Sequence, residues 1–212
     1  MDINIFSNEG SLYRITEWIT RLVYVNLLWI LFTLLGLIIF GVMPSTLAVF
    51  VVIKKWLSGQ ENVKVFSLFW ETYKSEFIRI NIIGIVMLII GTVLVFDLIY
   101  VQEYDGIFYL ILRFALYFLL FLYFIDLSYL FPIYIKYDLK MSNILKNALF
   151  FAFITPKETL QLVLGLAAVS IFFRFLPSLL PFLSISLPVY VISWISSKTI
   201  VKVEEKLRQN KK

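Results

Sequence analysis

The chain contains no cysteine and no histidine, and only 16% of its 212 residues are charged. The absence of cysteine excludes disulfide bonds, thiolate catalysis and cysteine-based metal sites. The absence of histidine removes the most common general base and metal ligand, and with it any Ser-His-Asp triad. A soluble domain normally has about a quarter of its residues charged. These deficits exclude several enzyme classes and point away from a water-soluble fold.

Motifs that mark nucleotide binding and acyl transfer are missing as well. The sequence has no G-x-x-x-x-G-K-[ST] phosphate loop, no G-x-S-x-G elbow and no glycine-rich dinucleotide fingerprint. The few carboxylates expected within or outside the membrane are too scattered to act as a paired acid and base. We therefore predict that the protein is not an enzyme and that it binds no cofactor and no metal.

Long apolar blocks are what the chain does have, and hydrophobic residues make up 61% of it. A helix needs about 20 apolar residues to cross the hydrocarbon of a bilayer. We predict an all-α fold, a polytopic membrane helical bundle of about six spans in a single domain covering residues 1–212. A five-span alternative treats residues 22–56 as one long kinked helix. The predicted helices cover residues 22–40, 43–56, 79–100, 107–136, 157–176 and 182–200.

Three weaker segments show apolar residues at helical spacing on one face only. They are Leu12–Leu22, Val65–Phe77 and Met141–Ala152. Helices of this kind lie in the membrane interface, and we expect these three on the cytoplasmic side. Each precedes a pair of predicted spans, which suggests three repeated units, 8–56, 62–136 and 141–200. Residues 202–212 are predicted to form a basic cytoplasmic tail.

The distribution of charge predicts the orientation of the chain. With six spans and both termini in the cytoplasm, all of the 19 Lys and Arg residues except Arg113 and Arg174 lie on the inner side. This layout obeys the positive-inside rule. The five-span alternative, with the N-terminus outside, moves Arg14 and Arg21 to the outer side. We expect the protein in the cytoplasmic membrane of a bacterium, with both termini inside.

Five polar residues within the predicted spans are candidate site residues, because ionisable groups in hydrocarbon are costly and commonly functional. Asp126 lies deepest, and two interpretations stay open. It is either a proton or cation site in a transport path, or a carboxyl that hydrogen-bonds Ser128, Tyr123 or an Asn of a neighbouring helix. Asp97 and Arg113 are expected to form a structural ion pair across a hairpin. Asn26 and Asn81 are expected to hydrogen-bond between helices.

A second group of residues is a candidate partner surface. Phe66, Phe69, Trp70 and Tyr73 share one face of the Val65–Phe77 segment. Lys54 and Lys55 follow an apolar block, and we expect them to set topology and to contact anionic headgroups.

The order and spacing of several short motifs are similar to those of a known family. The motifs are Asn26-Leu-Leu-Trp29, Gly36, Gly41-Val-Met-Pro44, Lys54-Lys55-Trp56, Phe66, Phe69-Trp70, Lys74, Glu76-Phe77 and Arg79. With them the chain resembles the YesL-like family of bacterial integral membrane proteins, from about Tyr24 to Trp194. The second half matches in its hydropathy layout alone. The family has no established biochemical activity and no defined site residues.

The resemblance implies a role beside carbohydrate ABC importers, because members of the family are commonly encoded with them and with sensor kinase–regulator pairs. We therefore expect a non-enzymatic accessory protein that contacts the permease subunits of such an importer. The alternatives are a small transporter or channel, or a membrane partner of a sensor histidine kinase that controls sugar uptake. The expected partners include the lipid bilayer and exclude nucleic acid, and a homo-oligomer is compatible with the sequence.

Overall fold

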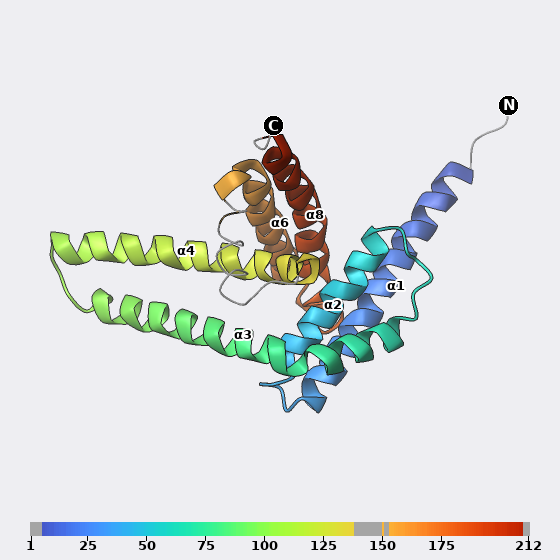
Figure 1. Ribbon diagram of the computed structural model, residues 1–212, viewed down its shortest axis with the longest axis horizontal. Coiled ribbons are helices and arrows are strands. Elements are labelled where there is room, and N and C mark those ends of the chain that lie inside the picture. Colours follow the sequence, from blue (N-terminus) through green and yellow to red (C-terminus); the bar gives the residue numbers. More distant parts are fainter. Residues whose placement is uncertain (1–5, 138–149, 151–152, 210–212) are drawn as a thin grey trace.

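The computed structural model describes residues 6–137, 150 and 153–209, and the regular structure of these residues is entirely helical. The predicted all-α class is confirmed. Figure 1 shows the helices in their order along the chain. They are α1 (Phe6–Leu35), α2 (Val42–Leu57), α3 (Val65–Gln102), α4 (Ile107–Lys136), α6 (Pro156–Phe175), the 3-10 turn η1 (Pro177–Leu179), α7 (Leu180–Leu183) and α8 (Ser186–Gln209).

The turn between α1 and α2 confirms that residues 22–56 form two helices rather than one kinked helix. A Cβ atom built on Gly41 would lie 2.4 Å from the carbonyl oxygen of Thr33, so the two chain segments approach too closely for a side chain there. Leu37 and Ile38 have positive φ angles of 54° and 66°, which reverses the chain within this turn. Pro44 lies in the first turn of α2, where its missing N–H removes no intrahelical bond.

Two of the predicted interfacial segments are not separate helices. Val65–Phe77 is the beginning of the 38-residue helix α3, and Leu12–Leu22 lies within α1. Neither helix contains a proline, and the first glycine of α3 is Gly84. A change from amphipathic to apolar sequence therefore does not end a helix when no residue breaks it. Of the third segment, Met141–Ala152, all residues except Phe150 lie outside the described residues.

The described residues contain slightly fewer candidate spans than the six predicted. Four helices are long and apolar enough to cross a membrane, and a fifth span results if the bent pair Pro177–Leu183 and Ser186–Glu205 counts as one. The shortfall comes from α2. Its 16 residues extend roughly 24 Å, which is less than the roughly 30 Å of the hydrocarbon core.

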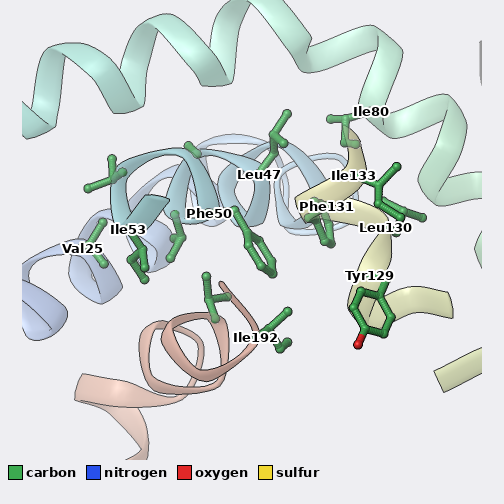
Figure 2. Packing of buried hydrophobic residues seen from close by; sticks show 14 of the residues in the cluster. Val25, Leu47, Phe50, Ile53, Ile80, Tyr129, Leu130, Phe131, Ile133 and Ile192 are labelled. Carbon is green, nitrogen blue, oxygen red and sulfur yellow. The ribbon is translucent and has the colours of Figure 1, made fainter. Parts of the chain in front are cut away.

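The core lies where α2 meets α1, α3, α4 and α8. Figure 2 shows Phe50 and Ile53 of α2 between Val25 of α1 and Ile192 of α8. Phe50 stacks on Phe131 of α4 with ring centroids 4.9 Å apart. Although α2 is short, it provides the surface against which the other helices pack.

The outer parts of α3 and α4 form a hairpin that extends away from this core (Figure 1). Tyr123 of α4 donates its hydroxyl to the carbonyl of Met87 at 3.0 Å, and Gln102 donates to the hydroxyl of Tyr117 at 3.2 Å. Most of the large apolar side chains on the hairpin are exposed. In the view of Figure 1, α6 and α8 cross the direction of the hairpin steeply, so the helices do not form one parallel array.

The C-terminal helix extends further than its predicted block, 182–200. It continues to Gln209, so residues 202–209 belong to α8 and only residues 210–212 of the predicted tail lie outside the described chain. Val203 is fully buried, and Tyr137 donates its hydroxyl to Glu204 at 2.9 Å. Packing and hydrogen bonding therefore hold this basic segment in a helix.

Candidate functional site

Asp126 is buried in α4, with 7% of its surface exposed. Its Oδ1 atom makes no hydrogen bond within the described residues. The hydroxyls proposed as its partners donate elsewhere, that of Ser128 to the carbonyl of Phe124 and that of Tyr123 to Met87. Asp126 therefore does not bind the two hydroxyls that the sequence suggested as its partners. Whether its role is structural or functional stays a prediction.

Asp97 and Arg113 do not form the predicted ion pair. The guanidinium of Arg113 instead donates to backbone carbonyls at the end of α3, to Val101 at 3.2 Å and Gln102 at 3.4 Å, and also to Tyr104. The side chain of Asp97 is exposed. The last carbonyls of a helix have no partner within that helix, so a nearby Arg finds strong acceptors there. Arg113 thus connects α4 to the end of α3 at the tip of the hairpin.

Asn26 of α1 is completely buried and contacts the start of α8. Its amide donates to the carbonyl of Pro181 at 2.9 Å, and its Oδ1 accepts from the backbone N–H groups of Ile185 and Ser186 at 3.0 and 3.2 Å. Asn26 therefore caps a helix that lies about 160 residues away in sequence. The predicted interhelical hydrogen bonding of this residue is confirmed.

Asn81 of α3 has a comparable position. Its amide donates to the carbonyl of Phe40 at 2.9 Å and to that of Phe77 at 2.8 Å. Phe40 lies in the turn between α1 and α2, so Asn81 connects α3 to this turn and not, as the sequence predicted, to a second helix. The similar roles of Asn26 and Asn81 agree with the proposed repeat, which stays a prediction.

The aromatic residues of the predicted partner surface do not share one exposed face. Phe69 is 0% exposed and Tyr73 is buried, and both rings pack on Phe32 of α1. Phe66 and Trp70 are about half exposed. The periodic face turns inward because α3 lies against α1 and α2, so Phe69 and Tyr73 are not available to a partner.

Lys54 and Lys55 lie in the last turn of α2, where positive charge stabilises the end of a helix. Lys54 is partly buried, and this burial, together with the charges of Lys136 and Lys55, lowers the pKa of its ammonium group. The described residues include no carboxylate that pairs with Lys54.

An apolar groove of about 1060 Å³ separates α1 from α6, with α7 and α8 along its floor. In Figure 1, α8 lies between α6 and α1. Small residues of α6, Gly165 and Ala168, line the groove together with the polar side chains of Gln161 and Lys198. Sequence reasoning missed this groove, although Gly165 and Ala168 are spaced to share a helix face.

Comparisons with known proteins identify relatives over most of the chain. Residues 22–98 match the family model described as "Protein of unknown function, DUF624". The chain is 40% identical to the uncharacterized protein YteU of Bacillus subtilis over 196 residues, 92% of this chain and 88% of YteU. It is 34% identical to YesV of the same organism over 94% of this chain and 96% of YesV.

The match to YesL of B. subtilis, also an uncharacterized protein, is 31% identical and covers 98% of both chains. No solved structure matches the chain significantly. The relatives align over nearly their whole length, and the resemblance inferred from the short motifs is confirmed. The chain belongs to the DUF624 family of YesL-like proteins, whose function is uncharacterised.

Proposed function

We propose that this chain is a non-enzymatic accessory protein of the membrane that binds a transmembrane helix of another membrane protein. The groove between α1, α6 and α8 is the observation that carries the proposal. It is concave, it is lined mainly by apolar side chains, and its volume of about 1060 Å³ accommodates a stretch of apolar helix.

The residues that line the groove suit a helix. Helices associate in lipid through close packing, which a small residue such as Ala168 permits. Ala168 is exposed, so its side chain meets an occupant of the groove without a rearrangement of α6.

Two polar side chains at the groove add specificity to this proposal. Gln161 lines it and makes no hydrogen bond to the described residues, and an amide in an apolar setting stabilises helix contacts by hydrogen bonding to a partner. The ammonium of Lys198 lies 3.3 Å from the ring centroid of Trp194, which holds it beside the same groove. A partner helix with polar residues at the same depth in the membrane would form hydrogen bonds with Gln161 and Lys198.

The resemblance suggests the identity of the partner. We propose the permease subunit of a carbohydrate ABC importer, with this chain in the bacterial cytoplasmic membrane and both termini inside. The groove replaces the predicted aromatic surface as the contact site, because two of the four aromatic side chains are buried.

Substitution of two adjacent alanines tests the proposal. Ala168→Trp fills the groove, whereas Ala167→Trp adds the same bulk at an exposed position that does not line it. We expect permease subunits to co-purify in detergent with the wild type and with Ala167→Trp, but not with Ala168→Trp. Equal recovery with both variants, or no permease with the wild type, would refute the proposal.

Asp126 supports a second candidate function, a small transporter or channel. Its buried Oδ1 atom has no hydrogen-bond partner in the described chain, and a carboxyl group in such a setting is costly and commonly functional. In proteoliposomes, Asp126→Asn would then abolish proton or substrate flux, and Ser128→Ala would not. This function is excluded if the wild type shows no flux above that of protein-free vesicles.

A further inference from the structure

A second cavity, of about 260 Å³, lies at the junction of α2, α4 and α8. Lys54 and Ser58 line it from the end of α2, Lys136 from the end of α4, and Ser193 from α8. The remaining walls are mostly apolar and include Phe50, Leu57, Pro132, Ile135, Ile200 and Val201. The cavity is therefore amphipathic, with lysines and hydroxyls beside aliphatic and aromatic side chains.

Lys54 is the cation of this cavity that has no counterion among the described residues. Glu204, the carboxylate that pairs with the other lysine of the cavity, binds Lys136 at 3.3 Å and accepts the hydroxyl of Tyr137. Burial and the bond to Glu204 raise the pKa of Tyr137 to about 12, so this phenol remains a hydrogen-bond donor to the carboxylate. Glu204 is thus engaged by two donors, and Lys54 faces a second lysine instead of an acid.

Ser193 provides an independent observation. Its side chain is 5% exposed, and its Oγ atom has no hydrogen-bond partner within the described chain. The neighbouring hydroxyls of Ser196 and Ser197 both donate to the carbonyl of Ser193, so they are satisfied. A buried hydroxyl without a partner is uncommon and calls for an explanation, such as a bound water or ion.

Helix stabilisation alone does not account for this arrangement. Lysines in the last turns of α2 and α4 offset the negative ends of those helices wherever their ammonium groups point. That role requires neither a cavity between the lysines nor a buried, unpartnered hydroxyl beside them. A negatively charged ligand with several oxygen acceptors would satisfy Lys54, Lys136 and Ser193 together.

We propose that the junction of α2, α4 and α8 is a binding site for a phosphate group attached to an apolar moiety, with Lys54 and Ser193 as its principal ligands. The phosphate oxygens accept from the ammonium of Lys54 and the hydroxyl of Ser193. The apolar moiety lies along Phe50, Leu57 and Ile200. An anionic phospholipid has this chemistry, and so does a soluble organic phosphate.

Full-length protein and a matched pair of variants test the site. Lys54→Gln removes one of the two lysine charges that line the cavity, and Lys55→Gln removes an adjacent charge that does not line it. Ser193→Ala is the second test variant, because the loss of one hydroxyl leaves the packing of α8 almost unchanged. The protein is purified in a neutral detergent, and its binding of dioleoylphosphatidylglycerol is measured by native mass spectrometry.

We expect Lys54→Gln to bind phosphatidylglycerol about tenfold more weakly than the wild type, since one charge-assisted hydrogen bond is lost. Ser193→Ala is expected to weaken binding less than Lys54→Gln does, and so is Lys55→Gln, because Lys55 does not line the cavity. Phosphatidylcholine serves as the neutral lipid control. In parallel, thermal unfolding is followed with inorganic phosphate in the absence of anionic lipid.

The two arms distinguish the sources of the phosphate. Binding of phosphatidylglycerol that depends on Lys54 supports a lipid ligand. Stabilisation by inorganic phosphate that depends on Lys54, without lipid binding, supports a soluble phosphate compound. The proposal is overturned if neither probe distinguishes Lys54→Gln from Lys55→Gln.

Discussion

The two halves of α3 lie in different surroundings, and the second half, which is the more apolar in sequence, is also the more exposed. In the first half, Phe69, Ile80 and Ile83 are almost completely buried against the core of the protein. In the second half, Phe96 is 67% exposed, and Val93 and Ile99 are also exposed. One continuous helix therefore changes from a packed element to the arm of a projecting hairpin (Figure 1).

This difference shows that apolar sequence reports the medium around a helix rather than its contacts within the protein. Lipid tails are as apolar as leucine, so hydrophobicity alone does not bring helices together in a bilayer. Polar side chains mark the packed half instead. Tyr73 donates its hydroxyl to the carbonyl of Phe32 at 3.1 Å, and Asn81 donates to Phe40. These bonds hold the first half of α3 on α1 and on the α1–α2 turn.

Substitution of one phenylalanine in each half gives the largest expected effect. Phe69→Ala removes a buried ring that packs on Phe32 with centroids 5.0 Å apart, and we expect it to lower the free energy of unfolding by about 3–5 kcal/mol. Phe96→Ala removes an exposed ring from the same helix, and we expect less than about 1 kcal/mol. Reversible unfolding in mixed micelles measures both values.

If Phe69→Ala and Phe96→Ala lowered the free energy of unfolding equally, the comparison would be contradicted. The second half of α3 would then be packed as tightly as the first half. A large effect of Phe96→Ala that appears only when the protein is extracted with its partners would place a protein contact on the hairpin. Trp70→Ala serves as a control for ring removal at a half-exposed position of the packed half.

The helices themselves were largely predictable from the sequence, because long apolar blocks and helix-breaking residues determine them. Pro156 begins α6 within one residue of the predicted start, and Gly36 and Gly41 lie at the ends of the turn that separates α1 from α2. The start of α3 is misplaced because a change in polarity near Phe77 predicts the end of a helix, although no residue there interrupts the backbone hydrogen bonds.

The candidate sites were less predictable, because they depend on contacts between distant segments. Asn26 was expected to bind another helix, but no local pattern identifies Ser186 as its partner. The phosphate site combines Lys54 of α2 with Ser193 of α8, and serine in an apolar helix gives no sequence signal of its own. The predicted aromatic partner surface is wrong for a different reason. An apolar face at helical spacing indicates burial within the protein as readily as contact with a partner.

The smallest expected effect concerns the tip of the hairpin, where the structure and the sequence prediction disagree most directly. Arg113 donates to the carbonyls of Val101, Gln102 and Tyr104 and not to Asp97. We expect Arg113→Gln to increase hydrogen exchange of residues 99–106 in lipid nanodiscs, because the last turn of α3 loses its ties to α4. Exchange in residues 65–80 is expected to stay unchanged, since the packed half does not depend on the tip.

Asp97→Asn is the matched control for this experiment. It removes the charge of Asp97 but keeps its size, and it leaves all the hydrogen bonds of Arg113 in place. We therefore expect wild-type exchange at the tip. If Asp97→Asn loosened residues 99–106 as much as Arg113→Gln, the two side chains would act as the ion pair that the sequence suggested. The hairpin would then be closed by charge rather than by the unpaired carbonyls at the end of a helix.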